Sequence, residues 1–206
     1  MTTRKLAVVT AGLSQPSSTR LLGDRLAAAT QRALTAQGAE TAIEVIELRD
    51  HAHDLTDNML TGFPSANLRQ AIDGTLTADG LIAVTPIFTA SYSGLFKSFF
   101  DVLDADALTG KPVLIAATGG TERHSLALEH ALRPLFAYLR AVVVPTSVYA
   151  ASSDWGTEDH GGRRTLGDRI ERAGGELADL VGRSTPSGPV DAFATPTPFE
   201  QLLGDR

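Results

Sequence analysis

Short apolar runs alternate along the chain with longer segments in which apolar residues recur at helical spacing. The runs that predict strands are 6–10, 44–48, 81–85, 112–117 and 142–148. The segments that predict helices are 18–37, 66–76, 92–103, 125–140 and 165–183, and the polar stretch 49–64 predicts a long loop. Because most of the strands are apolar throughout, they indicate a parallel sheet that is covered by helices on both faces.

This alternation predicts an α/β fold of three layers, with a five-stranded parallel sheet in the middle. Right-handed crossovers leave few topologies, and the flavodoxin-like strand order 2-1-3-4-5 fits best. We expect one domain over residues 1–183. The composition changes after Arg183, since 184–198 contains four prolines. The segment 184–206 is therefore either a frayed terminus or an arm that docks on the domain or on a partner subunit.

Composition narrows the possible functions of the 206 residues. A net charge of −6 argues against a nucleic-acid partner, because phosphate binding needs clustered basic residues. The absence of cysteine excludes disulfides, thiolate metal sites and a cysteine nucleophile, and it fits a reducing compartment. No apolar run approaches the roughly 18 residues of a membrane span, and residues 1–5 do not begin a signal peptide. We expect a soluble, cytoplasmic protein with no metal site.

In an open parallel sheet the ligand lies beyond the carboxyl ends of the strands, where the strand order reverses. For the order 2-1-3-4-5 this crevice lies between the first and third strands. The loops that follow the first, third and fourth strands are therefore the candidates for a binding site.

Hydroxyl side chains crowd the first of these loops, just before the predicted helix 18–37. They are Ser14, Ser17, Ser18 and Thr19, with Gln15 among them. Free N–H groups and the helix dipole favour an anion at such a position, whereas ordinary N-capping would explain one hydroxyl and not four. The loop matches neither Gly-x-Gly-x-x-Gly nor a Walker motif, so it indicates a terminal phosphate, as in a mononucleotide.

The second loop offers flat apolar surface beside backbone donors, which suits a planar heterocycle. Its candidate residues are Pro86, Ile87, Phe88, Thr89, Ser91 and Tyr92. On physical grounds alone, Phe88 and Tyr92 could equally be an aromatic pair of the core.

The third loop contains paired glycines within the run Thr118, Gly119, Gly120 and Thr121. Glycines let the backbone approach a ligand closely and direct its N–H groups towards it. The alternative is a flexible turn between a strand and a helix. The histidine that follows, His124, is more typical of a surface or capping residue than of a catalyst.

Together the three loops resemble those of the NAD(P)H-dependent FMN reductases of the flavodoxin-like superfamily. The likeness is greatest to the reductase components of two-component flavin-dependent monooxygenases that desulfonate alkanesulfonates. It spans about residues 5–150, and the matching stretches are 12–19, 85–97, 117–124 and 128–135.

The resemblance implies a role for each loop. The hydroxyls of 14–19 would hold the FMN phosphate, residues 86–92 would line the isoalloxazine, and 118–121 would donate amides to its pyrimidine end. It also implies NADPH or NADH as the electron donor, a homodimer or homotetramer, and a partner monooxygenase that receives reduced FMN. Many relatives have a basic residue just after the loop serine, where this chain has Gln15, so the choice between NADPH and NADH stays open.

Hydride transfer to a flavin is chemistry that the cofactors supply, so we name no catalytic side chain. Backbone N–H groups of Gly119 and Gly120 would stabilise the negative charge that develops on the flavin, and Gly119→Val is expected to weaken FMN binding and turnover. Two other functions remain open: an FMN-binding electron carrier of the flavodoxin type, and a quinone or azo reductase on the same fold.

Overall fold

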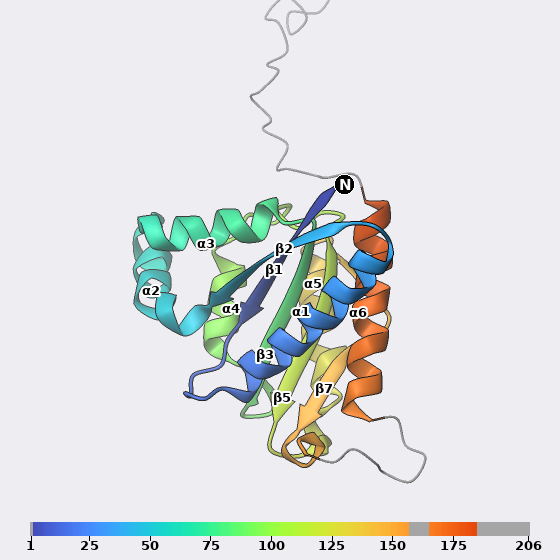
Figure 1. Cartoon of the computed structure of the whole chain (residues 1–206). Coiled ribbons are helices and arrows are strands. Elements are labelled where there is room, and N and C mark those ends of the chain that lie inside the picture. Colours follow the sequence, from blue (N-terminus) through green and yellow to red (C-terminus); the bar gives the residue numbers. More distant parts are fainter. Residues whose placement is uncertain (1, 157–164, 185–206) are drawn as a thin grey trace, which may run out of the picture.

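A twisted sheet lies between two layers of helices in the computed structural model, which describes residues 2–156 and 165–184 (Figure 1). The strands are β1 (Thr3–Thr10), β2 (Glu40–Glu47), β3 (Gly80–Phe88), β4 (Ser91–Tyr92), β5 (Pro112–Gly119), β6 (Val142–Val143) and β7 (Val148–Ala151). The helices are α1 (Ser18–Ala36), α2 (Ala52–Thr61), α3 (Ala66–Thr77), α4 (Gly94–Asp101), α5 (Arg133–Tyr138) and α6 (Leu166–Arg183). Turns of 3₁₀ helix span Leu48–His51, Glu122–His124 and Ser152–Asp154, and a π-helical turn spans Leu128–Leu132.

The strands run in the order β2-β1-β3-β5-β6, all parallel, and the order reverses at β1 and β3 as expected. The flavodoxin-like α/β fold with a parallel sheet is therefore confirmed. The prediction of five strands was wrong, because this sheet has seven: β7 also pairs with β5, and β4 forms an antiparallel hairpin with β3.

The predicted strand 142–148 is broken in two at Pro145, which has no N–H group to donate to a neighbouring strand. Side chains from other elements satisfy the backbone in the gap. Arg133 donates to the carbonyl oxygens of Val144 at 3.2 Å and Pro145 at 3.3 Å. The Glu176 carboxylate accepts from the backbone N–H and the hydroxyl of Thr146, at 2.7 and 2.8 Å.

Strand ends differ from the prediction by up to four residues, and three further elements differ more. The segment 49–64 is not a loop, because it contains α2; only Leu55 and Asn58 of that helix are buried, too few for a visible helical period. The predicted helix 92–103 starts at Gly94, because Tyr92 pairs with Ile87 in the hairpin. Of the predicted helix 125–140, only α5 is α-helical, and the π-helical turn precedes it.

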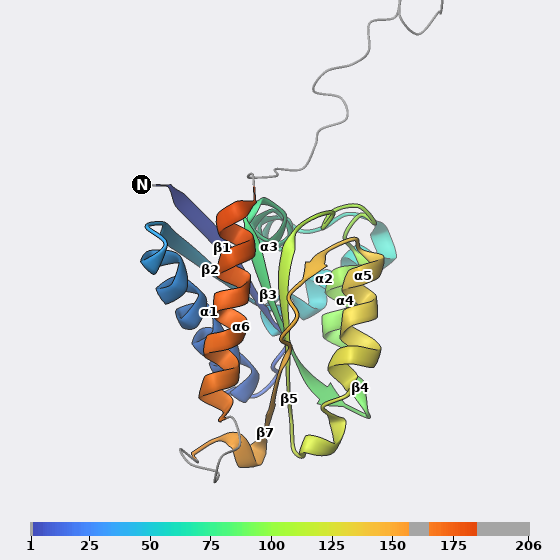
Figure 2. The same ribbon diagram turned by 90° about the vertical axis from the view of Figure 1, so that its right-hand side faces the viewer.

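Each face of the sheet has its own apolar core. Helices α1 and α6 cover one face, while α2 to α5 cover the other (Figure 2). In the second core Phe100 packs between Phe96 and Phe136, with ring centroids 4.8 and 4.9 Å apart. Because β1, β3 and β5 are parallel, their carboxyl ends meet at one edge of the sheet, between the two cores.

The predicted tail 184–206 lies outside the described residues, apart from Ser184. Within 2–156 and 165–184, no helix combines the length and the apolar character needed to cross a membrane.

Candidate functional site

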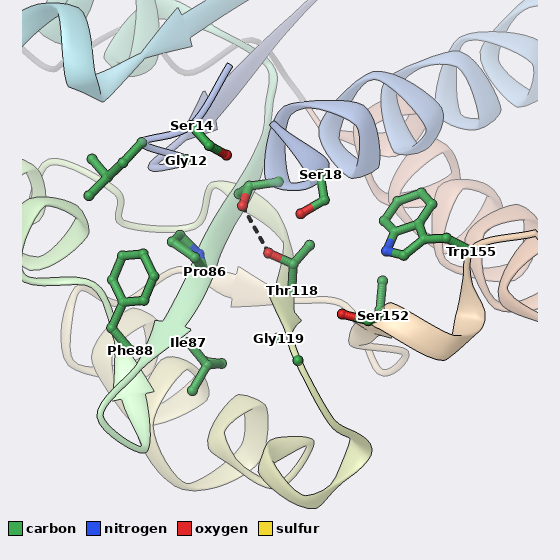
Figure 3. A pocket seen from close by; sticks show the side chains of 14 residues that line it. Gly12, Ser14, Ser18, Pro86, Ile87, Phe88, Thr118, Gly119, Ser152 and Trp155 are labelled. Atoms are coloured by element: carbon green, nitrogen blue, oxygen red, sulfur yellow. Dashed lines mark hydrogen bonds between the residues drawn. The ribbon is translucent and has the colours of Figure 1, made fainter. Parts of the chain in front are cut away.

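A pocket of about 410 Å³ lies at the carboxyl ends of β1, β3, β5 and β7 (Figure 3). This is the size range of small-ligand sites, and it is the edge at which the strand order reverses. The lining residues are Gly12, Leu13, Ser14, Ser18, Thr19, Pro86, Ile87, Phe88, Thr118, Gly119, Gly120, Ala150, Ser152 and Trp155. None of these side chains is charged.

The structure brings together residues from all three predicted loops. Those that line the pocket are Ser14, Ser18, Thr19, Pro86, Ile87, Phe88, Thr118, Gly119 and Gly120. The other predicted site residues belong to the same loops but do not line the pocket; they are Gln15, Ser17, Thr89, Ser91, Tyr92 and Thr121.

The hydroxyls of the first loop have different tasks. Ser17 is the N-cap of α1, and its Oγ accepts from the N–H of Arg20 at 3.2 Å. Thr19 and Thr118 join the first and third loops through a buried hydrogen bond of 2.8 Å between their hydroxyls. Either hydroxyl can donate in this pair, and the one that accepts keeps its own hydrogen for a ligand. Ser14 and Ser18 have no such partner within the part of the chain that is described.

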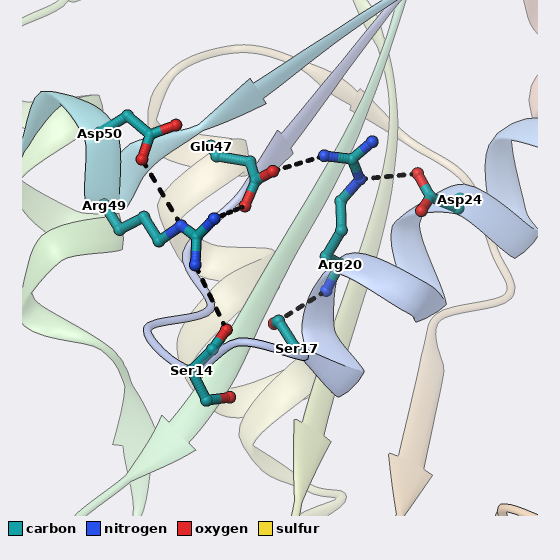
Figure 4. A network of polar contacts seen from close by, with 7 residues as sticks. All are labelled: Ser14, Ser17, Arg20, Asp24, Glu47, Arg49 and Asp50. Carbon is teal, nitrogen blue, oxygen red and sulfur yellow. Dashed lines mark hydrogen bonds and ion pairs between the residues drawn. The ribbon is translucent and has the colours of Figure 1, made fainter.

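Gln15 lies against an arginine from another element. With its amide oxygen facing Arg49, it accepts from Nη1 of that side chain at 2.7 Å. Arg49 follows β2, and it also pairs with Glu47 at 3.1 Å and with Asp50 at 3.5 Å (Figure 4). Sequence reasoning missed Arg49, although its place directly after a strand was a signal. Because two carboxylates balance its charge, Arg49 braces the loop and is not an unpaired cation.

The second loop is held by a buried threonine and a tight hairpin. Thr85 Oγ1 accepts from the N–H of Ser93 at 3.1 Å and donates to the carbonyl oxygen of Pro86 at 3.0 Å. The two aromatic residues of this loop separate. Tyr92 packs towards the core, with its ring 6.0 Å from that of Phe96, whereas Phe88 is 47% exposed at the rim of the pocket.

The paired glycines of the third loop are not equivalent. A Cβ on Gly119 would overlap the hydroxyl of Tyr149, which donates to the carbonyl oxygen of Thr121 at 2.7 Å. Burial raises the pKa of Tyr149, with Asp154 and Glu122 adding to the effect, so its phenol stays protonated as the donor. A Cβ on Gly120 would meet nothing within 4 Å. The packing of Tyr149 is by itself enough to require glycine at position 119. Loss of FMN binding in Gly119→Val would therefore not show that Gly119 contacts the ligand.

The predicted site did not include the residues that β7 and the turn after it contribute. These are Ala150, Ser152 and Trp155. Trp155 is the single tryptophan of the chain, and it follows the last strand of the sheet, which was an available signal. Arg25 of α1 lies over its ring, 5.1 Å from the centroid.

The lining therefore combines hydroxyl and backbone donors near the N-terminus of α1 with apolar surface at Pro86, Ile87 and Phe88. A phosphate monoester fits the first part, since hydroxyls and helix N–H groups bind it without a cation. A planar heterocycle fits the second. No cluster of three or more histidine and carboxylate side chains suited to a metal occurs in the ranges that the structure describes.

Comparison with known proteins agrees with this geometry. Residues 4–156 match the model of the family described as NADPH-dependent FMN reductase. The chain belongs to this family. The FMN reductase (NADPH) of Pseudomonas aeruginosa is 40% identical over 153 residues, which are 73% of this chain and 78% of that protein. The NADH-dependent FMN reductase SfnF of Pseudomonas fluorescens is 39% identical over the same shares of the two chains.

Solved structures of similar proteins match this chain over most of its length. An oxidoreductase from Corynebacterium diphtheriae is 47% identical with a TM-score of 0.85, covering 90% of this chain and all of that one. The NADH:FMN oxidoreductase EmoB, in its apo form, is 28% identical with a TM-score of 0.71, covering 89% of this chain and 91% of that one. The family predicted from the three loops is thus confirmed, and the matched range includes Trp155.

Proposed function

We propose that this protein is an NAD(P)H:FMN reductase that transfers hydride from the nicotinamide to FMN. The observation that carries the proposal is the pocket at the N-terminus of α1. Hydroxyl groups lie there next to an apolar wall, and no residue that lines the pocket is charged. The relatives named FMN reductase support it, and their names include both NADPH and NADH as donors.

In this proposal Ser14, Ser18 and the Thr19–Thr118 pair donate hydrogen bonds to the phosphate of FMN. Pro86, Ile87 and Phe88 line the ring system, and the backbone N–H groups of Gly119 and Gly120 face its polar edge. FMN, when bound, supplies the hydride acceptor. The protein's own part is to orient the ring and to present fixed dipoles where negative charge develops.

The partners belong to the same proposal. We expect a homodimer or homotetramer, and the exposed apolar side chains Leu126, Tyr138 and Val142 beside α5 support an interface there. Reduced FMN would pass to a flavin-dependent monooxygenase, an expectation supported by the resemblance of the three loops. Cytoplasmic localisation stays a prediction.

The test is to mix the protein with FMN and either NADH or NADPH, and to follow the absorbance of the reduced nicotinamide. We expect oxidation with at least one donor, and turnover of free FMN faster than that of a quinone or an azo dye. No oxidation with either donor would contradict the proposal and favour an electron carrier. Faster turnover of a quinone or an azo dye would instead favour the reductase alternative on the same fold.

The serine variants test the placement of the phosphate. Ser18→Ala should weaken FMN binding about tenfold or more, because a hydrogen bond to a charged group is lost. Ser98→Ala is the matched control, since Ser98 lies on α4, donates to the carbonyl oxygen of Gly94 and does not line the pocket. Equal effects of the two substitutions would remove Ser18 from the phosphate site.

A further inference from the structure

The side of the pocket that faces the N-terminus of α1 carries two donors that follow β7. Figure 3 shows the Ser152 hydroxyl and the indole nitrogen of Trp155 on the same side of the pocket as the hydroxyls of Ser18 and Thr118. These groups come from α1, β5 and the turn after β7, and they share one cavity.

The turn that holds Trp155 is well anchored. Asp154 accepts from the N–H of Ala151 at 2.8 Å and pairs with Arg169 of α6 at 3.1 Å. On the other side, the guanidinium of Arg25 stacks over the indole at 5.1 Å. The position of the indole is thus determined by both helices that cover this face of the sheet.

The indole Nε1 can only donate a hydrogen bond. No residue in 2–156 or 165–184 accepts one from it, although Trp155 is partly buried in the wall of the cavity. A donor that faces a cavity in this way is suited to an anionic ligand, which supplies acceptors on several sides.

Charge in the surroundings points the same way. Arg20 is engaged by Asp24 at 2.8 Å and by Glu47, which also pairs with Arg49. Arg25, in contrast, forms no ion pair with any described residue. Among the described residues Arg25 is thus a cation without a carboxylate partner, stacked on the indole, and it adds positive potential to this side of the cavity.

We infer that Trp155 Nε1 and Ser152 Oγ donate hydrogen bonds to the phosphate of FMN, together with the hydroxyl of Ser18 on the same side of the pocket. The inference rests on the proposed function and adds a specificity role for the segment after β7. Trp155 and Ser152 would make this protein select the phosphorylated flavin over riboflavin, which has the same ring system without the phosphate. The other phosphate source is the diphosphate of the nicotinamide donor, and the experiment separates the two.

The experiment measures dissociation constants of FMN and riboflavin by quenching of flavin fluorescence, without a nicotinamide donor. Trp155→Phe keeps an aromatic ring beside Arg25 and removes the N–H donor together with the five-membered ring that carries it; lost packing alone would weaken both flavins, whereas a lost phosphate contact weakens FMN only. The substitution should weaken FMN binding about tenfold or more and leave riboflavin binding within about twofold. Ser152→Ala should act in the same direction. Ser98→Ala is again the control, because it removes one donor from α4 outside the pocket.

Three results would overturn the inference. Equal weakening of both flavins by Trp155→Phe would make the indole a wall for the ring system, and no change in either would remove it from the site. An increase in KM for NADH or NADPH, with FMN binding unchanged, would assign the indole to the diphosphate of the donor. Riboflavin binding also reports that the variant is folded. If the wild type oxidises NAD(P)H and Trp155→Phe still prefers FMN over riboflavin, only this inference is overturned. If the wild type does not oxidise NAD(P)H, the proposed function is overturned.

Discussion

The two adjacent glycines of the third loop allow stability to be separated from ligand binding. A Cβ on Gly119 would overlap the hydroxyl oxygen of Tyr149 and lie 3.1 Å from its ring carbon Cζ. Tyr149 is buried, with 4% of the residue exposed, so its ring has little room to move away. Gly119→Ala must therefore displace the phenol and break its 2.7 Å hydrogen bond to the carbonyl oxygen of Thr121.

The expected cost follows from these contacts. Overpacking a buried site costs about 1–3 kcal/mol, and loss of the hydrogen bond to a buried hydroxyl adds about 1 kcal/mol. We expect Gly119→Ala to lower the free energy of unfolding by about 2–4 kcal/mol, and to lower Tm by roughly 4–16 °C for a chain of this length. Gly120→Ala should change stability by less than about 1 kcal/mol, because its Cβ meets nothing within 4 Å.

The assay is urea unfolding of both variants without flavin, followed by FMN titration of each. A second substitution tests the cause: Tyr149→Phe removes the overlapped oxygen and should restore most of the stability lost in Gly119→Ala. The reasoning would be refuted by a Gly119→Ala variant as stable as wild type, or by a double variant with purely additive losses. Gly120→Ala should weaken FMN binding while stability is retained, since Gly120 lines the pocket.

Three further predictions concern stability. A Cβ on Gly174 would lie 2.9 Å from the backbone of α1, so Gly174→Ala should lower the free energy of unfolding by about 1–3 kcal/mol. Gly175 has open space around it, so Gly175→Ala should raise the free energy of unfolding by about 0.5–1 kcal/mol. Equal urea midpoints for the two variants would contradict the close packing of α1 and α6. Hydrogen bonds from Arg133 hold the pKa of Glu129 below its ordinary value of 4.5, so its contribution is complete above that value and is lost as the pH falls through the lowered pKa. Acid unfolding should accordingly be steeper in wild type than in Glu129→Gln, and identical pH slopes would rule this out. Thr89 adopts a φ of 48°, which is strained for a β-branched residue, so Thr89→Asn should raise the free energy of unfolding by about 0.5–1 kcal/mol; a loss of stability would show that the threonine side chain is needed there.

Much of the site could be predicted because chain topology and local chemistry act together. Parallel strands with right-handed crossovers place the carboxyl ends of β1, β3 and β5 at one edge, whatever the side chains are. The hydroxyls at Ser14 and Ser18 and the glycine at Gly120 could then be assigned to one pocket from their positions alone. The family was predicted separately, from the resemblance of the three short motifs at those strand ends to those of the FMN reductases.

Other features depend on contacts between residues that are distant in the sequence. The helix α2 was missed because Leu55 is the only apolar side chain that it buries, and a single residue has no period. The last strand is interrupted at Pro145, where Arg133 and Glu176 replace the hydrogen bonds of a neighbouring strand. The sequence could not show that Arg133 and Glu176 lie at this gap, because their positions depend on how α5 and α6 pack on the sheet.

The first loop shows the same division. The sequence by itself determined that hydroxyls gather before α1, because N-capping and anion binding both act within one helical turn. Only the tertiary structure decided that Thr19 joins Thr118 and that Trp155 faces the cavity. Hydrogen bonds and packing between separate elements exist only once the chain has folded, so no local pattern encodes them.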